Sequence, residues 1–158
     1  MQAPELTVAA VVEQRGRFLM VEEIADGKKV INQPAGHVEP GETLINAVVR
    51  EAREETAWKF LPKAINGVYL WQHPEKGSRF LRVTFCGEVS DHDVKQELDT
   101  GILRTLWLSR DDLLARSEQL RSPMVMKAID DYLAGVRYPS NMFQQLELEQ
   151  LAIHAKVV

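Results

Sequence analysis

Apolar runs of strand length recur along the chain and predict a fold rich in β-structure. Leu6–Val12 is apolar and rich in β-branched residues. Phe18–Ile24 follows it after a turn at Gly16, so we expect the two segments to form a hairpin. Residues 34–41 contain two prolines and two glycines, which predicts a loop. Four further segments are expected to be extended: Val30–Asn32, Val68–Trp71, Phe80–Phe85 and Leu103–Leu108.

Helical periodicity is clearest early in the chain. Within Thr43–Thr56, apolar residues such as Leu44 and Val48 recur on one face, and the first residue of the segment is a suitable N-cap. Two later helices are expected to begin near Ser109 and Ser122. Strands thus outnumber helices, with one helix early and two or more late. The simplest packing is an α/β sandwich with helices on both faces of a mixed sheet.

The length and charge of the chain narrow the classes of protein to consider. With 158 residues it can bury one sizeable core. Its net charge of −4 argues against a nucleic-acid platform, and we expect neither a signal peptide nor a membrane span. The single cysteine, Cys86, indicates a reducing, cytoplasmic compartment. We expect one domain over residues 1–140 and a C-terminal tail over residues 141–158, either a last helix or an arm against a partner. We accordingly expect either a monomer or a homodimer.

Candidate chemistry is concentrated on the early helix. Glu51, Glu54 and Glu55 are three or four residues apart, so their carboxylates can converge on one side. A charged stretch of this kind is usually only a solvated helix face. Residues 36–58, however, carry five acids and two bases, a net charge of −3. A hard divalent cation would relieve this repulsion, and Mg²⁺ suits carboxylates that also meet phosphate.

The spacing around this helix resembles the signature of the Nudix hydrolase family. The signature reads G-x5-E-x7-R-E-U-x-E-E-x-G-U, where U is aliphatic, and it is matched by Gly36, Glu42 and residues 50–55. The resemblance implies a Nudix-type α/β/α sandwich whose loop–helix–loop motif catalyses hydrolysis of phosphoanhydride bonds. Ala57 departs from the glycine of the signature, and Trp58 from its last aliphatic position. Because a left-handed helix end favours glycine, Ala57→Gly is expected to raise the melting temperature without changing turnover.

The resemblance extends beyond this box to bacterial Nudix phosphatases, from Leu6 to about Pro139. It implies that the substrates are small diphosphates. These are nucleoside di- and triphosphates, or pyrophosphates of thiamine precursors such as hydroxymethylpyrimidine pyrophosphate. The segments that carry it are Thr7–Ala9 and residues 32–37, 80–82, 107–109, 121–123 and 137–139.

The resemblance also implies roles for residues of the box. Mg²⁺, or Mn²⁺ in its place, is expected on the carboxylates of Glu51, Glu54 and Glu55 and on the backbone carbonyl of Ala35. Arg50 is expected to orient a neighbouring glutamate through charge-assisted hydrogen bonds. Within the box, Glu51 and Glu54 are both candidates for the general base.

For residues other than the metal ligands, the sequence allows more than one role. Gly36 and Glu42 are expected to brace the loop against the helix. A fourth acid, or the base itself, is predicted at Glu97 or Asp99, although both residues are equally well explained as solvated loop acids. Trp71 and Trp107 are expected in the core. Four residues are candidates for substrate binding, each with a structural contact as its alternative: His37, Arg82, Arg121 and Tyr138.

Two alternative functions stay open at this stage. Removal of pyrophosphate from RNA 5′ ends would favour a basic groove, which the net charge of −4 and the absence of a dense Lys/Arg cluster disfavour. A non-catalytic ligand sensor with the same fold can lose the acids of the box, and this sequence keeps them. The leading hypothesis is Mg²⁺-dependent hydrolysis of small diphosphates, with no membrane and no nucleic acid as partner.

Overall fold

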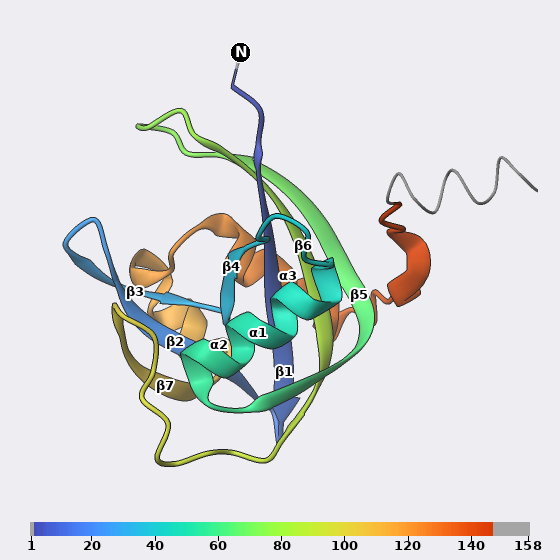
Figure 1. Cartoon of the computed structure of the whole chain (residues 1–158). Helices are drawn as coiled ribbons and strands as arrows, with labels where there is room; N and C mark the ends of the chain where they lie inside the picture. The colour runs from blue at the N-terminus through green and yellow to red at the C-terminus, as the bar shows by residue number, and fades with distance from the viewer. Residues whose placement is uncertain (1, 147–158) are drawn as a thin grey trace, which may run out of the picture.

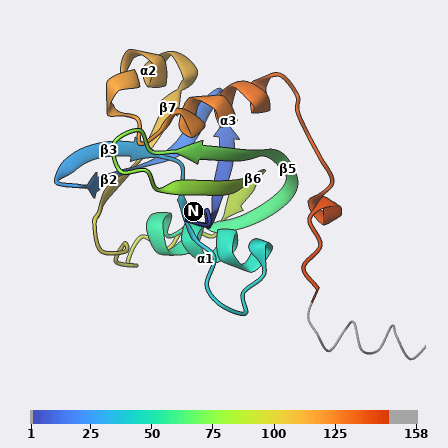
Figure 2. The ribbon, with the colours of Figure 1, turned by 90° about the horizontal axis from the view of Figure 1, so that it is seen from above.

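The computed structural model, which describes residues 2–146, places a mixed β-sheet between two layers of helices (Figure 1). Figure 2 shows α1 (Leu44–Thr56) on one side of the strands, and α2 (Arg110–Ala115) and α3 (Pro123–Leu133) on the other. The predicted α/β sandwich with helices on both faces is therefore confirmed. None of the helices in residues 2–146 is long and apolar enough to span a membrane.

The strands follow the order β3-β2-β1-β6-β5, with β4 added beside β1 and β7 beside β2. The β1–β6 pair is parallel, and the other pairs are antiparallel, so the sheet is mixed. Two short 3₁₀ helices, Ser117–Gln119 and Ser140–Met142, complete the described secondary structure. The strands are β1 (Glu5–Gln14), β2 (Arg17–Ala25), β3 (Lys28–Asn32), β4 (Ala35–His37), β5 (Lys59–Gln72), β6 (Arg79–Ser90) and β7 (Ile102–Ser109).

The strand β1 is apolar on both faces because it is buried on both. Val8 and Val12 belong to the core beneath α1, together with Leu44 and Val48 of that helix. Val11 points the other way, into the core that α3 covers. This double burial explains why the first segment reads as a continuous apolar run and not as an alternating one.

Two sequence-based boundaries were wrong. The predicted loop over residues 34–41 contains the short strand β4, because Ala35–His37 pairs antiparallel with Thr7–Ala9 of β1. The segment predicted as Val68–Trp71 is only the end of β5, which begins at Lys59 and pairs with β6 along its length. Shifts of register accommodate Pro62 and Gly67, two residues that weaken a strand pattern in the sequence.

The helix α1 has the predicted start and an unusual end. The side chain of Thr43 accepts a hydrogen bond from the Asn46 amide, as an N-cap should. Ala57 closes the helix in the left-handed conformation, with φ 60° and ψ 13°. Its methyl group is fully buried, so a glycine there would lose packing as it relieves strain.

The segment over residues 91–100, which contains Glu97 and Asp99, has no helix or strand, and its backbone contacts α1. Its backbone amides at Asp93 and Asp99 donate to the carbonyls of Ala57 and Glu54, at 3.0 and 2.9 Å. The Gln96 side chain donates to a third carbonyl near the helix end, at 2.6 Å. The loop therefore caps the C-terminus of α1.

The predicted tail is described only as far as residue 146. In that part the Gln145 side chain donates to the Glu42 carbonyl at 3.0 Å, which ties the segment to the start of α1. The choice between a last helix and an arm depends on residues 147–158, which lie outside the described residues.

Candidate active site

Arg50 joins the box loop to the helix that carries the acids. Its Nε and Nη2 donate to the two oxygens of Glu42, at 2.7 and 2.9 Å, and Nη2 also donates to the His37 carbonyl at 3.0 Å. Its Nη1 donates to Glu51 at 2.8 Å and to Glu54 at 3.1 Å. This planar fork uses its donors in fixed directions, so Arg50 orients three carboxylates at once.

The glycine of the box is required by Glu51. A Cβ atom on Gly36 would lie 2.1 Å from the Glu51 Cδ atom, far inside van der Waals contact. The strand β4 therefore lets its backbone approach the Glu51 carboxylate only because residue 36 has no side chain. Gly36 does more than the predicted bracing, since it creates the space that the carboxylate occupies.

Glu51 and Glu55 are buried acids. Only 9% and 6% of their surfaces are exposed. Burial raises the pKa of Glu51, opposed by Arg50. Burial raises the pKa of Glu55 to about 9, although its carboxylate accepts a hydrogen bond from the Ala35 amide at 2.8 Å. The nearby charges of Glu23 and Asp99 add to this rise, so the site concentrates negative charge in a region poor in water.

The chemistry of these donors fits a hard divalent cation. Arg50 takes one oxygen each of Glu51 and Glu54, and the Ala35 amide takes one of Glu55. Within residues 2–146 the second oxygen of each carboxylate has no hydrogen bond. Within the same residues, no group of three or more Asp, Glu, His or Cys side chains is already close enough together to hold a metal ion. Arg50 compensates only part of the negative charge of these acids, and the second oxygens of the three carboxylates would be available to hold a cation.

The loop acids are placed differently. Asp99 is linked to α1 through its amide, and its charge contributes to the raised pKa of both Glu51 and Glu55. Glu97 is exposed. Of the two predicted candidates, Asp99 is the one that the fold brings to the acids.

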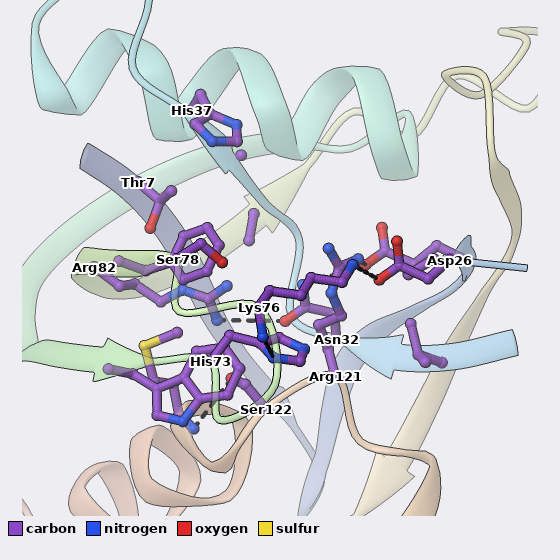
Figure 3. A pocket seen from close by; sticks show the side chains of 18 of the residues that line it. Thr7, Asp26, Asn32, His37, His73, Lys76, Ser78, Arg82, Arg121 and Ser122 are labelled. Carbon is purple, nitrogen blue, oxygen red and sulfur yellow. Dashed lines mark hydrogen bonds and ion pairs between the residues drawn. The ribbon is translucent and has the colours of Figure 1, made fainter. Parts of the chain in front are cut away.

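A cavity of about 560 Å³ adjoins this site (Figure 3). Ala35 and Gly36 form part of its wall, so the backbone that contacts Glu55 and Glu51 also faces the cavity. Three of the four predicted substrate-binding residues line it: His37, Arg82 and Arg121. Tyr138 does not, because its backbone pairs with Ile65 of β5.

The lining also contains residues that were not predicted to bind substrate. Glu23 pairs with Arg121 at 3.0 Å, and its nearby charge would not be visible from local spacing. Trp71 was expected in the core, but it is only half-buried and lines the cavity, stacked on Phe80 with ring centroids 5.8 Å apart.

His37 and the tryptophans also make contacts within the fold. The His37 ring lies 2.5 Å from a carboxylate oxygen of Glu5, in an exposed pair. Trp107 packs against the core beneath α1 and meets Trp58 edge to face, with ring centroids 6.4 Å apart. Trp58 also stacks on His92, so the aromatic residue in place of an aliphatic one is used in packing.

Comparisons with known proteins agree with this geometry. The model of the NUDIX domain matches residues 3–128. The protein named Phosphatase NudJ of Escherichia coli is 42% identical over 139 residues, which is 88% of this chain and 90% of that protein. Its counterpart in Shigella sonnei is 41% identical over the same share of each chain.

Solved structures show the same fold. A NUDIX hydrolase from Nitrosomonas europaea superposes with a TM-score of 0.89 at 47% identity, over 91% of this chain and 98% of that one. A MutT NUDIX hydrolase from Burkholderia pseudomallei superposes with a TM-score of 0.70 at 19% identity, over 82% and 98%, which supports the fold alone.

Proposed function

The chain belongs to the Nudix family and is a phosphohydrolase, and from this premise we propose that it hydrolyses phosphoanhydride bonds of small diphosphates with Mg²⁺. The candidate substrates are nucleoside di- and triphosphates and thiamine-precursor pyrophosphates such as hydroxymethylpyrimidine pyrophosphate. The observation that carries the proposal is the pair of buried acids, Glu51 and Glu55, set against the backbone of β4 beside a cavity. Buried acids with raised pKa values are typical of functional sites.

Glu51, Glu54, Glu55 and the carbonyl of Ala35 would hold the Mg²⁺, or Mn²⁺ as a substitute. When bound, the ion would screen phosphate charge and lower the pKa of a water molecule. Arg50 keeps two of the carboxylates in position through Nη1. We propose Glu51 or Glu54 as the group that accepts the proton of the attacking water, and Asp99 as the fourth acid.

Three further expectations accompany this proposal. A small-molecule substrate fits the cavity volume, which lies in the range of ligand sites. Residues 1–140 would form the hydrolase domain, and the family match lies within them. We propose a cytoplasmic location, in keeping with the single, buried Cys86.

The direct test is turnover on a panel of substrates with Mg²⁺. The panel contains nucleoside di- and triphosphates, nucleotide sugars, dinucleoside polyphosphates, hydroxymethylpyrimidine pyrophosphate and a triphosphorylated RNA oligonucleotide. Phosphate and pyrophosphate are measured separately. Release of terminal phosphate from small diphosphates is expected. Pyrophosphate release alone, activity confined to sugar nucleotides or activity confined to RNA would contradict the proposal.

Charge-removing variants inside and outside the site test whether the activity depends on these acids. Glu54→Gln and Glu51→Gln each remove one charge from the site, and Glu88→Gln removes one from an exposed position on β6. The first two are expected to lower kcat by roughly a hundredfold or more, and the last to leave it unchanged. Full activity in Glu54→Gln, with Mg²⁺ binding intact, would exclude Glu54 as the base. No turnover by the wild-type protein on any substrate would favour a sensor.

A further inference from the structure

Arg82 is a buried cation that contacts no carboxylate of residues 2–146. It lies on β6 and is only 7% exposed. Its Nη1 donates to the Asn32 side chain at 3.3 Å, and its Nε is buried with no hydrogen-bond partner anywhere in residues 2–146. Burying a charge in this way is unfavourable unless a partner compensates it.

Thr7 presents a second unmet polar group beside the first. β1 and β6 run parallel with Thr7 opposite Arg82, so the two side chains lie on the same face of the sheet. Thr7 is 5% exposed, and its Oγ1 also lacks a partner among the described residues. Both residues line the cavity, and Figure 3 shows Arg82 between Thr7 and Asn32.

The nearby acids do not satisfy Arg82. Glu23 is engaged with Arg121 at 3.0 Å and accepts from the Asn32 amide at 3.4 Å. Glu55 accepts from the backbone amide of Ala35. Burial lowers the pKa of Arg82 to about 10, which still leaves it protonated at neutral pH.

We propose that Arg82 and Thr7 form an anion subsite in the wall of the cavity, and that it binds the phosphoryl group of the substrate that is not attacked. This proposal rests on the proposed function, because it assigns the second phosphate of a diphosphate. Acids that would hold a cation contact one part of the cavity wall, at Ala35 and Gly36. The Arg82 guanidinium, whose Nε has no partner within residues 2–146, lines the same cavity. A diphosphate therefore meets a separate positive group for its second phosphate, and the unmet donors gain an acceptor.

The first test measures stability without metal or turnover. Wild-type protein, Arg82→Met and Arg79→Met are melted in EDTA with and without inorganic pyrophosphate. Arg79 lies on the same strand but does not line the cavity, so its variant controls for the loss of charge. Pyrophosphate is expected to raise the melting temperature of the wild type and of Arg79→Met. Arg82→Met is expected to melt at the same or a higher temperature, because an uncompensated charge is removed, and to lose most of the response.

Three results would overturn the proposal. One is the absence of any response to pyrophosphate in the wild type. Another is an equal response in Arg82→Met. The third is a melting temperature for Arg82→Met well below that of Arg79→Met, which would make Arg82 a structural counter-charge for the acids around it.

Steady-state kinetics of Arg82 and Thr7 variants test the subsite independently. Arg82→Met is expected to raise KM by roughly tenfold to a hundredfold with kcat changed less than about threefold, as for a lost charge-assisted hydrogen bond used in binding. Thr7→Val is expected to raise KM in the same way, and Thr7→Ser, which keeps the hydroxyl, is expected to restore it. Unchanged KM in both Arg82→Met and Thr7→Val would refute the subsite, even where the wild-type enzyme is active. If the wild-type protein turns over none of the substrates, the proposed function is refuted, whatever the effect of pyrophosphate on the melting temperature.

Discussion

A single methyl group at Gly36 would test whether the backbone of β4 positions a catalytic carboxylate. A Cβ atom there would lie 2.1 Å from the Glu51 Cδ and Oε1 atoms, whereas ordinary contacts begin near 3.4 Å. The carboxylate must therefore move by roughly 1.3 Å, the difference between these distances. The backbone itself accepts alanine, because Gly36 is not among the glycines with positive φ.

The expected result of Gly36→Ala is a large loss of rate with a moderate loss of stability. A shift of this size breaks the 2.8 Å hydrogen bond between Glu51 and Arg50. Displacement of a catalytic group by about 1 Å costs on the order of a hundredfold in rate. Overpacking costs about 1–3 kcal/mol, which lowers the melting temperature by roughly 2–10 °C in a chain of this length. Turnover with Mg²⁺ and thermal melting measure the two effects.

A double-mutant cycle with Glu51→Asp separates crowding from general damage. Aspartate is one methylene shorter, so its carboxylate leaves room for the new methyl group. Gly36→Ala is expected to cost about a hundredfold in the wild-type background and less than about threefold in the Glu51→Asp background. An equal factor in both backgrounds, or full activity of Gly36→Ala alone, would show that the close approach does not position Glu51.

Three further predictions concern the same helix. Burial raises the pKa of Glu55 from 4.5 to about 9, above its unfolded value, so the metal-free protein should lose stability as pH rises between these values. Melting in EDTA across this range checks the loss, and Glu55→Gln should show a smaller loss, because only the raised pKa of Glu51 remains. Arg50→Lys keeps the charge but cannot reproduce the fork to Glu42 and Glu51, so kcat should fall roughly tenfold or more in a turnover assay, and an unchanged kcat would contradict the role of the fork. Ala57→Gly relieves about 1 kcal/mol of left-handed strain but loses about 0.8 kcal/mol of methyl burial, so its melting temperature should change by less than about 3 °C, smaller than the gain expected from sequence, with turnover unchanged.

The sequence by itself determined the features that depend on short spacing. The helix over residues 44–56 was predicted with its N-cap, because 3.6-residue periodicity and capping chemistry are local. The fixed distances from Gly36 through Glu42 to residues 50–55 were enough to identify the box, since its loop and helix are contiguous in the chain. The sandwich of helices on a mixed sheet followed from the order of the elements.

Only the tertiary structure decided what lies around the acids. Thr7 and Arg82 are far apart in sequence and become neighbours through the parallel pairing of β1 with β6, which periodicity in either strand does not encode. The same is true of Glu23, whose charge reaches Glu55 only after β2 has joined the sheet. Burial of the Ala57 methyl and the exposure of Trp71 to the cavity also depend on packing between distant segments. Local spacing thus specified the catalytic motif, while long-range strand pairing determined the cavity that the substrate must enter.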